Sequence, residues 1–197
     1  MALPLLNVLR STEPTYRTFS RRTQLPLQAE QMWRIESGIV RTFTWLEDGC
    51  LVTLGFWGAG DVLGKALSRV TTPYHAECLT DVKAIPLSPD QWHQETNALI
   101  EHIRQSGELL EILHCSQTEV SLLRALNWLA KRFGQDSHTG RRIDFRLTHQ
   151  ELAELIGATR VTVTRMLNDF EKRGLIHRQR RSITVVPEQS PFWHYEI

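Results

Sequence analysis

The sequence predicts an α+β fold, in which antiparallel strands dominate the first half of the chain and helices the second. Three observations support this prediction. Short apolar runs separated by glycine turns occupy residues 31–86, which is typical of a small antiparallel barrel or jelly roll. Apolar residues then recur at helical spacing from 92 to 115. Two shorter helical patterns follow at 148–156 and 160–173, separated by Gly157.

The composition sets the first limits on function. The chain has 197 residues, of which 41% are hydrophobic and 23% charged, enough for two small domains. No apolar run approaches the roughly 20 residues of a membrane-spanning helix, and the N-terminus lacks a signal-peptide pattern. We therefore expect a cytoplasmic protein without a membrane partner. Residues 137–197 contain ten Lys/Arg and seven Asp/Glu, which places +3 there and −2 on the rest, so the C-terminal part is suited to meet phosphates.

The residues that could carry catalysis or hold a metal are scattered. Cys50, Cys78 and Cys115 are widely spaced and form no C-x-x-C pair of the kind that indicates zinc or an iron–sulfur cluster. The eight histidines show no spacing typical of a catalytic triad or a metal site. We expect no enzyme, no metal site and no bound cofactor.

In the strand-rich half, residues 1–24 are polar and basic and predict a short helix or loose arm, with a first strand near 23–27. Apolar runs at 32–35 and 39–45 flank Glu36-Ser37-Gly38, which predicts a β-hairpin. Further strands are expected at 51–57, 62–67 and within 75–86, after turns at 47–49 and 58–61.

The long helical pattern of residues 92–115 carries an apolar stripe at alternating steps of four and three, the seam of a coiled coil. The stripe could pack on its own domain, but its length and charged flanks favour a parallel homodimer. We expect a hinge near 114–117. The predicted seam consists of Leu99, Ile103, Ser106, Leu110, Leu113 and Gln117.

The pattern from Thr148 to Gly174 predicts two short helices and a tight turn. Thr148 and Glu151 form a capping box, and Gly157 can take the left-handed conformation that ends a helix. An ordinary helical bundle could show the same features. The second helix, however, buries one face and turns a basic one outward, which suits the DNA major groove. Its buried side is Val163, Met166, Leu167 and Phe170, and its outward side is Arg160, Val161, Thr162 and Arg165.

The residues around these two helices complete the domain. A helix is expected at 122–133, a loop at 134–140 and a strand at 143–147. The run 175–186 predicts a hairpin with a basic tip. This hairpin could be a solvated turn, but it is typical of the wing of a winged helix-turn-helix, whose tip meets phosphates. The tip consists of Arg178, Gln179, Arg180 and Arg181.

Residues 119–186 resemble the DNA-binding domain of the cyclic-AMP receptor/fumarate-nitrate regulator family of bacterial transcription factors. The stretches IDFRLTHQELAELIG (143–157) and ATRVTVTRML (158–167) are most similar to its cyanobacterial global nitrogen regulator branch. A weaker resemblance over 38–86 implies a cyclic-nucleotide-binding-type β-roll. The implied division is a sensor-type roll over 1–96, a dimerisation helix and hinge over 97–117, and a winged helix-turn-helix over 118–197.

The resemblance also implies partners and roles. The implied protein is a homodimeric regulator, an activator or a repressor, with double-stranded DNA and RNA polymerase as partners. Val161 stands where the cyclic-AMP branch has glutamate, which implies a palindrome with GTA-type half-sites. Bases would be read by Arg160, Val161 and Arg165, and phosphates contacted by Thr148, Gln150, Thr159, Thr162, Arg180 and Arg181.

The implied effector pocket departs from the cyclic-AMP pattern. Lys65 stands where a glutamate would bind ribose, and the phosphate-binding arginine–serine pair falls near Thr72 and Pro73. A lysine cannot accept a hydroxyl proton, so we predict no cyclic-nucleotide response. Alternatively the roll binds 2-oxoglutarate or another anion, or Lys65 extends to solvent and side chains fill the pocket. The candidate pocket residues are Leu63, Gly64, Lys65, Ala66, Tyr74, Arg104 and Glu108.

Both ends of the chain carry further expectations. The entry before residue 32 is shorter than is usual in the family, so either the roll is reduced or the true start lies upstream. The tail contains Phe192, Trp193 and Tyr195 and is expected to fold back onto the domain.

Overall fold

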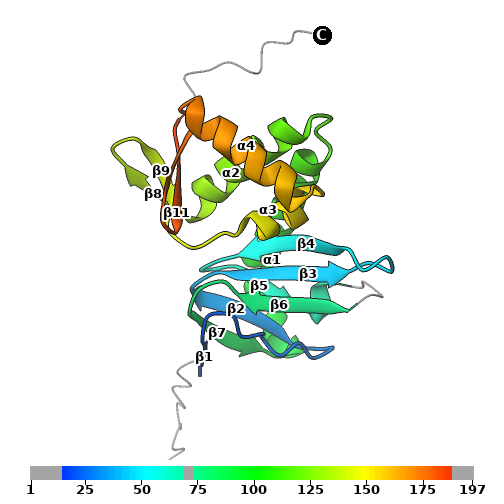
Figure 1. Cartoon of the computed structure of the whole chain (residues 1–197). Coiled ribbons are helices and arrows are strands. Elements are labelled where there is room, and N and C mark those ends of the chain that lie inside the picture. The colour runs from blue at the N-terminus through cyan, green and yellow to red at the C-terminus, as the bar shows by residue number, and fades with distance from the viewer. Residues whose placement is uncertain (1–14, 69–72, 188–197) are drawn as a thin grey trace, which may run out of the picture.

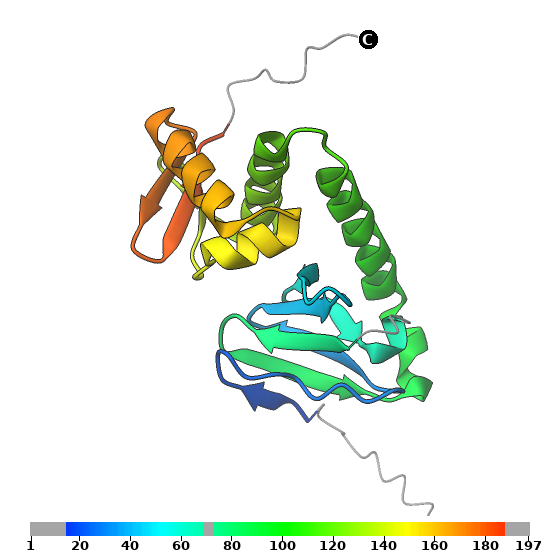
Figure 2. The same cartoon turned by 45° about the vertical axis from the view of Figure 1, so that its right-hand side comes forward.

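The computed structural model describes residues 15–68 and 73–187. The aromatic tail, Thr72 and the first part of the N-terminal arm lie outside the described residues. The described chain folds into a strand-rich N-terminal half and a helix-rich C-terminal half, joined by one long helix (Figures 1 and 2). None of the helices in these two ranges is long and apolar enough to cross a membrane.

The N-terminal half consists of two antiparallel sheets, as predicted for a β-roll (Figure 1). Between them lies an apolar cluster that includes Trp33, Val40, Trp57 and Leu63. One sheet has the order β1 (Arg17–Phe19), β7 (Val82–Leu87), β2 (Met32–Ser37) and β5 (Val62–Gly64). The other has the order β4 (Leu51–Trp57), β3 (Val40–Trp45) and β6 (Tyr74–Cys78).

The hairpin predicted around Glu36-Ser37-Gly38 is wrong. Strand β2 pairs with β5 and β7, whereas β3 pairs with β4 and β6, so the turn carries the chain from one sheet to the other. Gly38 has a φ of 89°, and a Cβ there would lie 2.2 Å from the carbonyl oxygen of Asp81. Glycine is therefore required at this crossing for its conformation and for the space it leaves.

The first strand is also misplaced in the sequence prediction. The structure has β1 at Arg17–Phe19, and the expected strand at 23–27 is reduced to an isolated bridge between Gln24 and Glu77. The expected strand at 62–67 ends early, because β5 stops at Gly64 and a 3-10 turn, η1, covers Lys65–Leu67.

The long helix begins later than predicted. Residues Pro89–Glu95 form a 3-10 helix, η2, and the α-helix α1 spans Thr96–Leu113. Its buried face consists of Gln105, Leu109 and Ile112. The next helix, α2, covers Thr118–Phe133 and meets α1 at an elbow (Figure 2), so the helix is interrupted where the hinge is expected, and movement at this point stays a prediction.

The C-terminal half contains the predicted winged helix-turn-helix. The loop expected at 134–140 and the strand at 143–147 are wrong, because the chain forms a β-hairpin that ends at Ile143. Gly140, at its turn, has a φ of 146°, and a Cβ there would lie 2.1 Å from the carbonyl oxygen of Val185. The elements are β8 (Gly134–Ser137), β9 (Gly140–Ile143), α3 (His149–Ile156), α4 (Arg160–Lys172), β10 (Ile176–Gln179) and β11 (Ser182–Val185), with the sheet order β10-β11-β9-β8.

The two halves share one apolar core. Phe56 and Leu79 of the roll belong to the same buried cluster as residues of α1 to α4. Ion pairs reinforce this junction: Arg132 of α2 lies 2.8 Å from Asp61, which precedes β5, and buried Arg41 of β3 pairs with Glu154 of α3. The roll therefore packs directly against the first helix of the helix-turn-helix (Figure 1).

Candidate nucleic-acid interface

Helix α3 has the ends that the sequence predicts. The Thr148 hydroxyl accepts a hydrogen bond from the Glu151 backbone at 3.1 Å, and the Glu151 carboxylate accepts one from the Thr148 backbone at 2.6 Å. Gly157 ends the helix in the left-handed conformation, with a φ of 66°. The capping box and the glycine fix the angle at which the chain enters the next helix.

Helix α4 has one buried and one exposed face. The Thr159 hydroxyl caps it by accepting a hydrogen bond from the Thr162 backbone at 3.1 Å. The predicted apolar side, Val163, Met166, Leu167 and Phe170, is buried. Val161 is 79% exposed, and Arg160 and Arg165 are exposed beside it. An exposed valine between two arginines on a capped helix is a surface suited to base edges.

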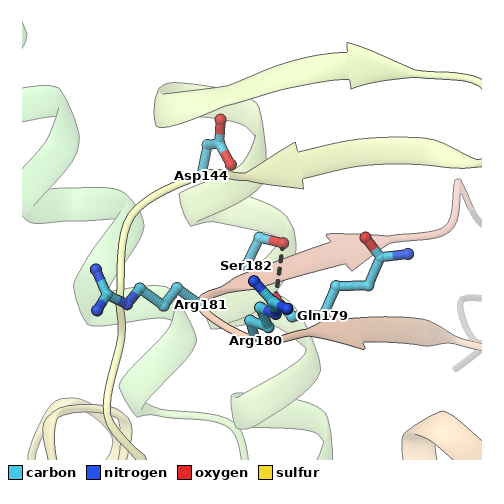
Figure 3. A pocket seen from close by; sticks show the side chains of 5 residues that line it. All are labelled: Asp144, Gln179, Arg180, Arg181 and Ser182. Atoms are coloured by element: carbon cyan, nitrogen blue, oxygen red, sulfur yellow. Dashed lines mark hydrogen bonds between the residues drawn. The ribbon is translucent and has the colours of Figure 1, made fainter.

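The wing is a β-hairpin, formed by β10 and β11, with a two-residue loop. Gln179 pairs with Ser182 across the turn Arg180-Arg181, and Ser182 Oγ donates to the Gln179 carbonyl at 3.1 Å (Figure 3). Both arginines are exposed. Arg178, predicted to be part of the basic tip, instead donates to Glu171 and Asn168 on α4. The hydrogen bonds from Arg178 to Glu171 lower the pKa of the Glu171 carboxyl. Through its contacts with Glu171 and Asn168, Arg178 holds the wing against α4.

Two surface hollows flank the wing tip. One, of about 740 Å³, is lined by Asp144 and by the tip residues 179–182 (Figure 3). The other, of about 520 Å³, lies where the starts of α3 and α4 meet the wing. Its lining includes Arg146 and His149, neither of which the sequence analysis named as a candidate for DNA contact. Their position was a usable signal, because Arg146 lies shortly before α3 and His149 is its first residue. The second hollow also includes Thr148, Gln150, Arg160, Arg178, Arg180 and Arg181.

The predicted effector residues lie in different surroundings. Leu63 and Gly64 are buried, and a Cβ on Gly64 would lie 2.5 Å from the carbonyl oxygen of Gln31 and 2.8 Å from Met32 Cα, so close packing at the start of β2 is sufficient to require this glycine. Lys65 is exposed, and Ala66 is half-buried. Burial raises the pKa of Tyr74 to about 12, against a smaller opposing effect of its hydrogen bond with Thr42.

The two effector candidates on α1 have contacts of their own. Arg104 is 71% exposed and lies 3.7 Å from Glu101, while Glu108 accepts a hydrogen bond from the Trp128 indole at 2.7 Å. These contacts join α1 to itself and to α2, so an effector role for either residue stays a prediction. Within the described ranges, no group of three or more His, Cys, Asp and Glu side chains is placed to hold a metal ion.

The predicted dimer seam is only partly an exposed stripe. Ile103 is 71% and Leu110 56% exposed, and Leu113 is also exposed. Leu99 packs partly against the roll, and Ser106 donates to the His102 carbonyl at 2.9 Å. The extension of the stripe to Gln117 is wrong, because α1 ends at Leu113 and Gln117 is the N-cap of α2. Ile100, which the prediction omitted, is exposed on α1 as well.

Comparisons with known proteins identify the same C-terminal unit. The family described as Crp-like helix-turn-helix domain matches residues 120–189. The regulatory protein CysR of Synechococcus elongatus is 43% identical over 168 residues, which cover 84% of this chain and 81% of the relative. The global nitrogen regulator of Synechocystis is 31% identical, over 87% of this chain and 84% of the relative.

A solved structure has the same architecture over nearly the whole chain. TTHB099, a transcriptional regulator of the CRP family from Thermus thermophilus, superimposes with a TM-score of 0.74 at 26% identity, over 86% of this chain and 91% of that one. This solved structure is a transcriptional regulator, and the two relatives are a regulatory protein and a global nitrogen regulator. With a capped helix-turn-helix, a basic wing and a relative of this similarity, the chain belongs to the CRP/FNR family of DNA-binding transcription regulators.

Proposed function

We propose that the chain acts as a homodimer and binds a palindromic DNA site with GTA-type half-sites. The observation that carries this proposal is the exposed face of α4, where Val161 stands between Arg160 and Arg165 while the opposite face is buried. Arginine can bind guanine O6 and N7 with two hydrogen bonds, and a valine methyl can contact the thymine methyl. Selecting bound duplexes from a random pool tests the half-site directly.

The exposed face of α1 supports the homodimer. Ile100, Ile103, Leu110 and Leu113 leave apolar surface uncovered on a helix whose other side is buried. Gly107 lies among them, and nothing within 4 Å would meet a Cβ there, so the chain's own packing does not require glycine. Glycine within a helix costs about 1 kcal/mol relative to alanine. The α1 helix of a second chain could approach closely at Gly107, because glycine has no side chain to keep the two backbones apart. The twofold symmetry of such a pair also suits two half-sites about 34 Å apart.

Replacing Arg165 with alanine is expected to weaken binding of the selected duplex by about 1–3 kcal/mol and to relax the preference at one base pair of each half-site. The exposed guanidinium would be lost without disturbing the buried side of α4. Fluorescence anisotropy with a set of single-substitution duplexes measures both effects. Equal losses on the selected and on a random duplex would contradict base reading by Arg165.

Replacing Arg180 with alanine is expected to weaken binding to all sequences about equally. Arg180 lies at the wing tip, where a phosphate contact adds affinity without base preference. The slope of log K against log salt should become shallower by about one unit per lost contact. Titrations at several salt concentrations measure the slope, with Arg17→Ala at an exposed arginine of β1 as the matched control; an unchanged slope in Arg180→Ala would argue against the contact.

We expect no saturable binding of cyclic AMP or cyclic GMP at micromolar concentration. The exposed Lys65 follows β5 at the position where a hydrogen-bond acceptor would be needed to bind the ribose hydroxyl. Isothermal titration calorimetry tests this, and saturable heat would contradict it. A second candidate is a regulator gated by 2-oxoglutarate or another anion that pairs with Lys65, although an exposed Lys65 is also what the solvent-extended alternative expects. In that case 2-oxoglutarate would change the affinity for the selected duplex, and Lys65→Gln would remove the change. If the chain activates transcription, RNA polymerase is its expected protein partner.

A further inference from the structure

The hydrogen bonds of His149, the first residue of α3, define which ring nitrogen carries the proton in the neutral side chain. Its Nδ1 lies 2.8 Å from Thr164 Oγ1, and the Thr164 hydroxyl donates to the Arg160 carbonyl, also at 2.8 Å. A carbonyl oxygen can only accept, and a hydroxyl has one proton to give. Nδ1 must therefore carry the proton donated to Thr164. In the neutral ring this leaves the lone pair on Nε2.

The charges that face His149 are almost all positive. The half-buried ring lines the hollow of about 520 Å³ together with Arg160 at the start of α4 and Arg146 before α3. Arg178 of β10 lines it too, paired with Glu171, as do Arg180 and Arg181 at the wing tip. Desolvation lowers the pKa of His149, and the charges of Arg178 and Arg160 lower it further. The ring is therefore neutral at pH 7 when no anion occupies the hollow.

A basic hollow at the helix-turn-helix and wing has the chemistry of a phosphate site. A neutral imidazole with its lone pair at Nε2 would oppose a phosphate oxygen, since both are acceptors. A protonated imidazole would donate a charge-assisted hydrogen bond instead.

We propose that His149 is a proton-dependent phosphate contact: on DNA binding, Nε2 takes up one proton from solvent and donates it in a hydrogen bond to a backbone phosphate in the basic hollow. This inference rests on the proposed DNA-binding function. The new N–H bond at Nε2 is formed with a proton that hydronium or a buffer acid releases, and each subunit takes up at most one proton.

The direction of the pH effect follows from linkage. In the free protein the pKa of His149 lies below its ordinary value, and the phosphate raises it in the complex. Affinity therefore increases as the pH falls through the pKa of the complex and levels off below the pKa of the free protein. Each unit of difference between the two values changes the affinity of one site about tenfold.

The test is fluorescence anisotropy of the full chain on one palindromic duplex from pH 5.5 to 8.0 at constant ionic strength. The wild type should bind about tenfold more tightly at the acidic end. His149→Asn keeps an N–H group but cannot titrate, so its binding should be weak and less dependent on pH. His149→Arg carries a permanent charge, so its binding should be tight and equally flat. The matched control is His177→Asn, at an exposed histidine on β10, which should keep the wild-type slope.

A second measurement does not depend on variants. Calorimetric titration of the wild type in two buffers of different ionisation enthalpy counts the protons taken up, and a net uptake that is greater than zero and below one per subunit is expected in the sloping pH range. No proton uptake, or an unchanged slope in His149→Asn, would overturn the inference while leaving DNA binding intact. Failure of the wild type to bind any duplex would instead overturn the proposed function.

Discussion

Replacing Leu110 with glutamate is expected to abolish both the homodimer and tight binding of a palindromic duplex. Leu110 is 56% exposed in the single chain, at the centre of the apolar face of α1. In a symmetric pair the two glutamates would lie close to the twofold axis, where like charges repel and buried carboxylates lose hydration. Without the pair, each chain binds one half-site, and an affinity gain of about 10²–10⁴ from linking two sites disappears.

Sedimentation velocity measures the first effect and anisotropy the second. The matched control is Leu46→Glu, the same substitution at a leucine that is 45% exposed in the turn after β3, outside α1. This control should sediment and bind as the wild type does. A Leu110→Glu protein that remains dimeric would show that the exposed face of α1 is not the seam.

Replacing Arg41 with alanine is expected to lower the free energy of unfolding by about 3 kcal/mol, the lower end of the range for breaking a buried ion pair. Arg41 is only 3% exposed and pairs with the carboxylate of Glu154, which would stay largely buried without its partner. The lower end applies because Gln150 still donates to Glu154 at 2.8 Å. Urea unfolding followed by circular dichroism measures the change.

Two further variants separate the ion pair from general damage. Arg104→Ala removes an arginine that is 71% exposed and pairs with Glu101 within α1, so its cost should stay below about 1 kcal/mol. The double variant Arg41→Met, Glu154→Leu should recover much of the loss, because apolar side chains replace buried ion pairs at little net cost. A loss below about 1 kcal/mol in Arg41→Ala would show that the pair contributes little.

The helix-turn-helix could be predicted well because its signals are local. The cap formed by Thr148 and Glu151, the left-handed Gly157 and the buried face of α4 each depend on residues within one or two helical turns. The wing tip was predicted for the same reason. Arg178 was assigned wrongly, since its partner Glu171 lies on the preceding helix and is captured only once the hairpin folds back on it.

The roll was harder to predict because its signals come from distant residues. Gly38 is followed by an apolar run, as in a hairpin, but the hydrogen bonds of β2 are made with β5 and β7. Strand pairing depends on which segments meet in space, and the local pattern does not specify it. Arg41 likewise looks like an outward-facing residue of a strand, and only its contact with Glu154, 113 positions away, accounts for its burial.

The apolar core that joins the roll to α2, α3 and α4 has a consequence for how the molecule melts. Phe56 and Leu79 lie in one buried cluster with Leu126 and Leu152, so separating the two halves would expose apolar surface on both of them. Neither half can therefore lose its order at low cost while the other keeps it. Heating should therefore give a single endotherm in calorimetry, because the winged helix-turn-helix and the roll unfold as one cooperative unit.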